Sequence, residues 1–349
     1  MDSLTLDNAI RGTNEDAVTS KLSAVTTGYI QDSYVKYFVK KPSRRPPIIN
    51  RGLKKALASS YVRYAGLDTL IKKFLEAGIG MDHSKDEQTK NNPKIKKQIV
   101  SLGAGSDTRY FNSKSKKLLD GLYKYFEIDY PEVTAKKVAV IRKNKQLSEL
   151  FEGNAKLGLG GTELYASDYC LLSGDLKDFV ETIIPRMEEQ GFDKSLPTLF
   201  LSECVLIYME QQYSDKIIQW VGDNMQTALF VVYEQILPND IFGITMLQNL
   251  RLRNIELRGI HAYPDLKSQK QRFLTRGWTF AEAVDINQIH DHHIDPKEMI
   301  RISELELLDE LEEWRLLSAH YCIAWAYSAK DESKKALFEQ VRFINYKIK

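Results

Sequence analysis

An α/β fold with a mostly parallel sheet is predicted by three observations. Short runs of Val, Ile, Leu, Phe and Tyr alternate with helical stretches, a Gly-rich turn follows the first run, and later runs end on an acid. Strands and helices that alternate in this way form βαβ units, whose strands pair in parallel. We therefore expect strands at 95–102, 123–129, 169–172, 198–201 and 228–233, with helices at about 131–150, 176–190 and 210–226.

Both ends of the chain extend this pattern. The N-terminal part is expected to be helical from Asp16 to about Lys40, and the prolines at 41–47 cannot continue a helix. A second helix is expected from Tyr61 to Ala77. Near the C-terminus we expect two more strands and an amphipathic helix between them, at 278–284, 321–327 and 302–318. The single domain thus divides into an N-terminal helical cap and linker, a core and a C-terminal tail, at 1–90, 91–330 and 331–349.

Composition is that of a globular protein. The 349 residues are 43% hydrophobic and 28% charged, and a net charge of +2 does not indicate a nucleic-acid partner. No secretory signal and no bilayer-spanning apolar run is present, so we expect a cytoplasmic protein without a membrane partner. The three cysteines are far apart, which argues against a disulfide framework or a thiolate metal site and favours a reducing compartment.

Histidines cluster at 290–293, in the order His-Asp-His-His. The i, i+4 spacing of a helical metal site is absent from this segment. We therefore expect a solvated loop there and no metal site.

The turn Gly103-Ala104-Gly105 lets the backbone approach a ligand closely, although a turn that needs positive φ would have the same sequence. Asp129 ends the second strand, 24 residues after Gly105. A carboxylate at that position can accept hydrogen bonds from both hydroxyls of a ribose. An aspartate before a helix that starts with Tyr130-Pro131 is alternatively an N-cap, but the order of strand, turn and acid favours a nucleoside site.

Thr108 occupies the place of the third glycine of a dinucleotide motif, which weakens the case for a bound pyrophosphate. S-adenosylmethionine has an adenosine and a sulfonium cation but no phosphate. Acids at several strand ends suit it: one for the ribose, one for the adenine amino group, and negative potential for the cation. Asp175 and Glu203 fill the second and third places, and each is alternatively a solvated acid.

With these segments in view, the sequence resembles the leucine carboxyl methyltransferase family over most of its length. The most specific stretch is Leu196 to Met209, which contains Glu203-Cys204-Val205-Leu206-Ile207-Tyr208-Met209. Further matching stretches are Glu15-Asp16-Ala17, Ser20-Lys21, Gly28-Tyr29, Ile49-Asn50-Arg51-Gly52, Tyr61-Val62-Arg63, the turn at 102–108, 125–131, Gly174-Asp175-Leu176, Tyr233-Glu234-Gln235, 240–243, Met246, 248–250 and 305–313.

The resemblance implies a Rossmann-like methyltransferase core of seven strands with an added N-terminal helical part. It also implies S-adenosylmethionine as cofactor, with contacts at Lys21, Arg63, Gly103, Asp129, Asp175, Leu176 and Glu203. Lys21 and Arg63 would meet the carboxylate of the cofactor or of the substrate. The sequence departs from the family pattern just before Arg63, because eight residues at 53–60 separate Gly52 from Tyr61. They either loop out or extend the following helix backwards.

The reaction that the resemblance implies is methylation of the C-terminal leucine carboxylate of the type 2A protein phosphatase catalytic subunit, by a monomer. Arg63 or Lys21 would fix the carboxylate, and Tyr208 would either orient it or be an ordinary core tyrosine. Tyr29, Tyr34 and Tyr37 could line a groove for the substrate tail, although packing on the sheet is favoured. The alternatives are a tRNA-modifying enzyme, a small-molecule O-methyltransferase and a non-catalytic binding module.

Overall fold

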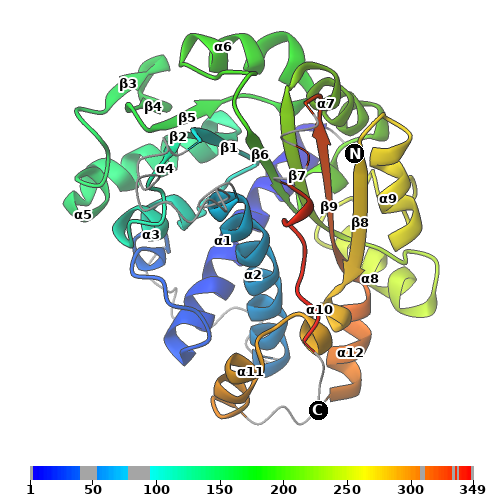
Figure 1. The fold of residues 1–349 in the computed structure, drawn as a ribbon. Coiled ribbons are helices and arrows are strands. Elements are labelled where there is room, and N and C mark those ends of the chain that lie inside the picture. The colour runs from blue at the N-terminus through cyan, green and yellow to red at the C-terminus, as the bar shows by residue number, and fades with distance from the viewer. Residues whose placement is uncertain are drawn as a thin grey trace, which may run out of the picture.

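The computed structural model describes residues 3–39, 53–77, 95–306, 311–331, 335 and 338–346, and within them the chain forms one nine-stranded sheet with helices on both faces (Figure 1). The prediction of an α/β fold is confirmed. The prolines at 41–47 lie outside the described residues.

Five parallel strands form the centre of the sheet. They are β5 (Tyr169–Ser173), β2 (Leu122–Asp129), β1 (Lys97–Leu102), β6 (Thr198–Glu203) and β7 (Thr227–Gln235), in that spatial order. All five match predicted strands. Nearly every residue of these strands is buried, as expected for a parallel sheet covered on both faces.

Antiparallel strands complete both edges. β9 (Tyr321–Ala329) and β8 (Phe280–Asp285), both predicted, follow β7, while β4 (Glu163–Tyr165) and β3 (Lys156–Gly158) extend the other edge beyond β5. The described residues therefore contain nine strands where seven were expected. The two extra strands have three residues each, too few to show an alternating pattern.

The side of the sheet on which successive strands are added changes at β1. The chain runs from β1 outward through β2 to β5, and then returns to β6 and β7 on the other side of β1. Loops after β1 and β6 therefore diverge, and the crevice between them is where open α/β sheets bind ligands.

Helices cover the two faces as separate layers. One face carries α2 (Leu53–Glu76), α3 (Arg109–Ser115), α4 (Pro131–Lys143), α5 (Lys145–Ser148), α10 (Ile286–His292) and α12 (Leu311–Ala319). The other carries η5 (Leu176–Asp178), η6 (Phe179–Ile183), α6 (Ile184–Glu189), α7 (Gln211–Asn224) and α9 (Leu266–Leu274).

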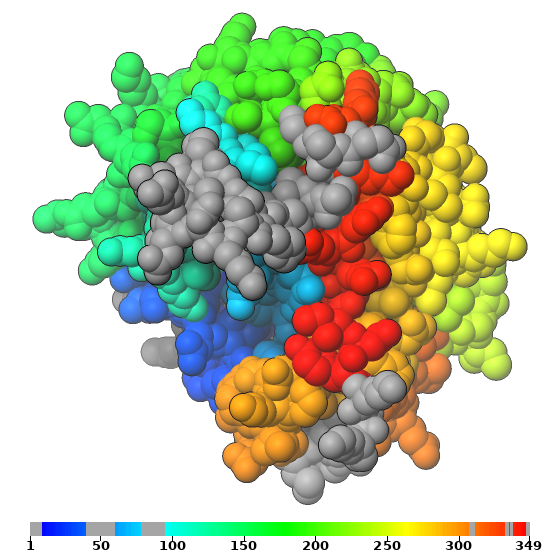
Figure 2. All heavy atoms as spheres, in the orientation of Figure 1, coloured from blue at the N-terminus to red at the C-terminus, as the bar shows by residue number. Residues whose placement is uncertain are grey.

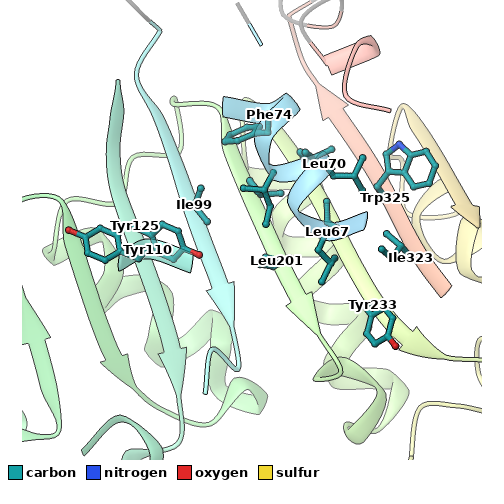
Figure 3. Packing of buried hydrophobic residues seen from close by; sticks show 14 of the residues in the cluster. Leu67, Leu70, Phe74, Ile99, Tyr110, Tyr125, Leu201, Tyr233, Ile323 and Trp325 are labelled. Carbon is teal, nitrogen blue, oxygen red and sulfur yellow. The ribbon is translucent and has the colours of Figure 1, made fainter. Parts of the chain in front are cut away.

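Helix α2 is the largest element on the first face and brings Arg63 to the ligand edge. Its residues Leu67, Leu70 and Phe74 are fully buried and point into the core beside the central strands (Figure 3). The helix was predicted from Tyr61 but begins at Leu53, so the segment 53–60 extends it backwards instead of looping out. Added turns at a helix N-terminus leave the register of later residues unchanged. At the C-terminal end of α2, the Nζ of Lys97 in β1 donates hydrogen bonds to the carbonyls of Phe74, Leu75 and Ala77.

The N-terminal helix differs from its prediction. α1 spans Ser3–Thr27, and a 3-10 turn, η1 (Val35–Tyr37), follows, where a helix from Asp16 to Lys40 was expected. Gly28, with φ +96°, ends α1 in a conformation that favours glycine. Tyr29, Tyr34 and Tyr37 pack against the core of the first face, which confirms the favoured interpretation over a groove lining.

Two C-terminal predictions are also wrong in detail. The segment expected as one helix at 302–318 instead contains the end of α11 (Pro296–Ser303) and all of α12, and each helix buries a residue in the core of the first face, Ile302 and Trp314. The histidine segment was predicted as a loop but lies at the end of α10, which Asp285 caps and Ile289 anchors in the core. His290 bonds Asp291 and packs on Trp314.

The C-terminal residues 338–346 lie across the first face, where Figure 2 shows them in red between α2 and the yellow and orange elements. Phe338 stacks on Phe74 and Phe343 packs edge-on against Trp325. Among the described helices, none has the length and apolarity to cross a membrane. Within the same residues, no three His, Cys, Asp or Glu side chains are placed to hold a metal ion.

Candidate active site

A cavity of about 500 Å³ opens at the carboxyl ends of the parallel strands. Its walls come from α1, α2, the turn after β1 and the ends of β2, β5, β6, β7 and β9. All the residues predicted to bind the cofactor or the substrate line it: Lys21, Arg63, Gly103, Gly105, Asp129, Asp175, Leu176, Glu203 and Tyr208. Its volume is in the range of about 300–1,000 Å³ that small-molecule sites usually have.

The glycine turn forms one wall of the cavity. Gly103 has φ +60° and Gly105 has φ +50°, which are left-handed conformations that other residues adopt at a cost. A Cβ at Gly103 would lie 2.5 Å from Val205 Cγ2, and one at Gly105 would lie 2.6 Å from Asn14 Oδ1. Both the backbone angles and the close contacts therefore require glycine here.

We expect Gly103→Ala to lower the free energy of unfolding by about 2–4 kcal/mol, because the new methyl group adds a clash to a strained backbone. Gly153→Ala is the matched control, since Gly153 has φ +72° but nothing within 4 Å of an added Cβ. Adding Val205→Ala to Gly103→Ala should restore part of the loss. Urea unfolding measures all three, and equal losses at Gly103 and Gly153 would show that the contact with Val205 does not matter.

Asp129 is held by two backbone donors. Gly105 N–H donates to Oδ2 and Tyr130 N–H donates to Oδ1, both at 2.7 Å. The residue at the N-cap of α4 is Tyr130, so Asp129 does not have the capping role that was its alternative. Burial raises the pKa of Asp129 above its usual value, and the two N–H donors oppose that rise. Each carboxylate oxygen keeps a second lone pair for a hydroxyl in the cavity.

Asp175 and Leu176 form a small cap beside the end of β5. The Asp175 side chain accepts a hydrogen bond from Lys177 N–H at 2.9 Å and so begins the 3-10 turn η5. Leu176 is the first residue of that turn, where a backbone N–H has no partner within the helix. A carboxylate acceptor and an N–H donor therefore stand side by side on the cavity wall.

Glu203 lies between two guanidinium groups. Arg63 Nε is 2.5 Å from Oε1, and Arg109 Nη1 is 2.7 Å from Oε2. Burial would raise the pKa of Glu203, but Arg109 and Arg63 outweigh it and lower that pKa to about 2. The carboxylate is therefore ionised at every physiological pH, and the site contributes negative charge next to two fixed cations.

This shift predicts a dependence of stability on acid. Because the pKa of Glu203 falls from 4.5 to about 2 on folding, its pairing stabilises the fold above pH 4.5 and is lost as the pH falls towards 2. We expect the free energy of unfolding of the wild type to fall more steeply than that of Glu203→Gln, by on the order of 1–3 kcal/mol over this window. Urea unfolding at half-unit pH steps measures the difference, and parallel curves would contradict the pairing.

Lys21 lines the cavity but is bound within the protein. Its Nζ lies 2.8 Å from Asp32 Oδ2, 2.7 Å from Thr108 Oγ1 and 3.6 Å from Asp107 Oδ1. Thr108, at the place of the missing third glycine, thus fastens α1 to the turn after β1. Lys21 supplies positive potential to this wall while its closest charged partner is Asp32.

With this geometry in hand, comparison with known proteins identifies the family. The model of the family "Leucine carboxyl methyltransferase" matches residues 9–222. A leucine carboxyl methyltransferase 1 homolog from Arabidopsis thaliana is 40% identical over 91% of this chain and 89% of its own. The chain belongs to the leucine carboxyl methyltransferase family. It is accordingly a methyltransferase that uses S-adenosylmethionine, as its sequence predicted.

Two other relatives show how far the likeness extends. Leucine carboxyl methyltransferase 1 of Bos taurus is 34% identical over 93% of this chain and 92% of its own. The human tRNA wybutosine-synthesizing protein 4 is 35% identical over 90% of this chain, but the match spans only 43% of that longer protein. Relatives with different names are therefore similar in sequence to most of this chain.

Sequence reasoning missed several polar residues around this site, and two of them organise its walls. Asn14 of α1 accepts from Ser106 N–H at 2.8 Å and donates to Ser106 Oγ at 3.0 Å, which holds α1 over the glycine turn. Arg109 contacts Glu203 and Asp107 and lies 3.4 Å from Asp68. Asn14 adjoins the matching stretch that starts at Glu15, and Arg109 follows the turn directly, so adjacency to the motifs was the only available signal.

Proposed function

We propose that this protein transfers the methyl group of S-adenosylmethionine to the α-carboxylate of the C-terminal leucine of the type 2A protein phosphatase catalytic subunit. The observation that carries the proposal is one continuous cavity in which acids at the ends of β2, β5 and β6 meet Arg63 and Tyr208. Two relatives that match over about nine tenths of both chains have the name leucine carboxyl methyltransferase 1, which supports a leucine carboxylate as acceptor.

The donor groups of the cavity suit each part of the cofactor. Asp129 would accept the ribose hydroxyls, while Asp175 and the N–H of Leu176 would bind the adenine edge. Gly103 and Gly105 would let the backbone lie against the nucleoside, since neither carries a Cβ. Glu203 would supply negative charge for the cationic end.

Arg63 and Lys21 are the candidates for holding a carboxylate. Among the described residues, Arg63 makes its hydrogen bond through Nε alone and lies 4.7 Å above the ring of Tyr233, so both Nη groups can donate to a ligand. Arg63 is thus placed to bind a carboxylate and keep it beside the cofactor. Lys21, already bound to Asp32, would act through its charge.

The acceptor needs orientation more than activation. A terminal carboxylate has a pKa of about 3.5, so it is ionised at neutral pH and no general base is required. Bound S-adenosylmethionine supplies an electrophilic methyl on a sulfonium; the new O–CH₃ bond forms as the S–CH₃ bond breaks, giving a methyl ester and S-adenosylhomocysteine. Positioning of this kind lowers barriers by about 7–11 kcal/mol in the best models.

Tyr208 would orient the acceptor by donating its hydroxyl hydrogen. Burial raises the pKa of Tyr208 well above its usual value, so the hydroxyl stays protonated at neutral pH. An apolar wall lies near it on the cavity surface, formed by Met209, Leu250 and Ile255. Such a wall suits the side chain of a terminal leucine better than a polar one.

We also propose a monomer that acts in the cytoplasm. All three cysteines, Cys170, Cys204 and Cys322, are free, which is consistent with a reducing compartment.

The test is transfer of a radiolabelled methyl group to the phosphatase catalytic subunit, compared with the same subunit lacking its terminal leucine. We expect label only in the intact subunit. Label that persists without the leucine contradicts the proposed acceptor. Label in tRNA instead would favour the activity suggested by the tRNA wybutosine-synthesizing relative.

A further inference from the structure

The cavity has a second half that none of the cofactor contacts uses. It is formed by Cys204, Gln235 and Tyr321, which lie at the end of β6, the end of β7 and the start of β9. The sheet order is β5-β2-β1-β6-β7-β9, so these residues lie on the far side of Glu203 from Asp129 and Asp175. A ligand bound here would face the cofactor across Arg63 and Glu203.

Strand pairing places Gln235 and Tyr321 next to each other. They are direct cross-strand partners in the antiparallel pair of β7 and β9, so their side chains lie on the same face of the sheet. Tyr321 stacks on Tyr233 with ring centroids 5.4 Å apart and planes 15° apart. Arg63 lies over that same Tyr233 ring, so one aromatic ring positions both Arg63 and Tyr321.

The hydrogen bonds in this half leave a donor for a ligand. Cys204 Sγ lies 4.0 Å from Gln235 Oε1, so the amide oxygen of Gln235 faces the thiol. The N–H₂ group of the same amide is therefore the part of Gln235 available to Tyr321. Burial raises the pKa of Tyr321 to about 12, and a hydrogen bond from Gln235 opposes that rise. The Tyr321 hydroxyl therefore keeps its hydrogen at neutral pH and can donate it to a ligand.

Acids near this half are already paired. Both oxygens of Glu203 are bound by arginines, and Glu234, which alternates to the other side of β7, bonds buried Arg272 at 2.9 Å. What faces the ligand is therefore a set of neutral N–H and O–H donors beside Arg63. Neutral donors can bind one oxygen of a carboxylate while withdrawing less charge than a second cation would, so the other oxygen stays nucleophilic.

From this arrangement we propose that Gln235 and Tyr321 bind the carboxylate of the acceptor and orient one of its oxygens towards the methyl group. The inference rests on the proposed function and adds two acceptor-binding residues to it. It requires that both residues act on the acceptor and not on the cofactor.

Two isosteric variants test this. Tyr321→Phe keeps the stacking on Tyr233 but removes the donor, and Gln235→Glu places a negative charge opposite the acceptor. We expect the KM for the phosphatase catalytic subunit to rise at least fivefold in Tyr321→Phe and at least twentyfold in Gln235→Glu. The Kd for S-adenosylmethionine, measured by calorimetry, should stay within twofold of wild type, which also shows that each variant is folded.

Tyr123→Phe is the matched control, because it removes a tyrosine hydroxyl at the opposite end of the central strands, and it should change neither constant. An unchanged KM in both variants, or a Kd for S-adenosylmethionine that rises as much as the KM, overturns the inference. If the wild type binds S-adenosylmethionine but does not methylate the subunit, the proposed function fails and this inference fails with it. If the wild type methylates the subunit but neither variant changes the KM, only the proposed role of Gln235 and Tyr321 is contradicted.

Discussion

Asp129→Ala is expected to weaken S-adenosylmethionine binding by about 1–3 kcal/mol for each ribose hydroxyl that loses its acceptor, or at least tenfold in Kd. The side chain already accepts from Gly105 and Tyr130 N–H, so its loss also releases the glycine turn. Asp129→Asn should show a smaller effect, because the amide retains one acceptor oxygen and a similar shape. Calorimetric titration with S-adenosylmethionine measures both variants.

Asp178→Ala is the control for this series, since Asp178 is an exposed aspartate of η5 that does not line the cavity. The affinity of Asp178→Ala for S-adenosylmethionine should equal that of the wild type. Unchanged affinity in Asp129→Ala would rule out the ribose contact.

Arg63→Met should lower kcat/KM for the acceptor by about 100-fold, which corresponds to about 2.7 kcal/mol of lost transition-state stabilisation. The variant removes the cation that pairs with Glu203 at 2.5 Å and that lies over Tyr233. Arg63→Lys is not expected to restore the rate, because an ammonium lacks the planar fork that bonds Glu203 and a ligand carboxylate at once. Steady-state methyl transfer to the phosphatase subunit gives the ratio.

Lys72→Met provides the comparison on the same helix, because Lys72 is exposed and its pair with Glu76 is a surface pair at 3.8 Å. Wild-type rates are expected for it. If Arg63→Met also keeps a kcat/KM within threefold of wild type, Arg63 has no part in catalysis.

The parts of the fold that the sequence predicted are those with a strong local pattern. The five central strands are short runs rich in Val, Ile, Leu, Phe and Tyr, and each was placed within a few residues of its observed bounds. Asp129, Asp175 and Glu203 meet at one edge because carboxyl ends of parallel strands share an edge, so their grouping follows from topology alone. The glycine turn could also be predicted, because its two positive φ angles favour glycine.

Other features depend on contacts between distant residues and left no local signal. Arg109 pairs with Glu203 across 94 positions and Asn14 with Ser106 across 92, and neither spacing can be read from one sequence. The end of α1 was misplaced because the turn around Asp32 is stabilised by its own side chain and by Lys21 and not by an apolar pattern. Strands β3 and β4 were missed because each has only three residues.

Arg63 shows how the structure resolves an ambiguity of the sequence. The eight residues at 53–60 could have displaced it by looping out, but they extend α2 at its start and leave the later turns in place. The Arg63 guanidinium therefore reaches Glu203 despite the insertion.

The most direct test is a crystal structure of the protein with S-adenosylhomocysteine. The predicted result places the ribose within hydrogen-bond distance of Asp129, the adenine edge at Asp175 and Leu176, and the sulfur towards Tyr208, Gln235 and Tyr321. A ligand bound away from the wall formed by Gly103 and Asp129, or one whose sulfur faces away from the end of β7, would contradict it.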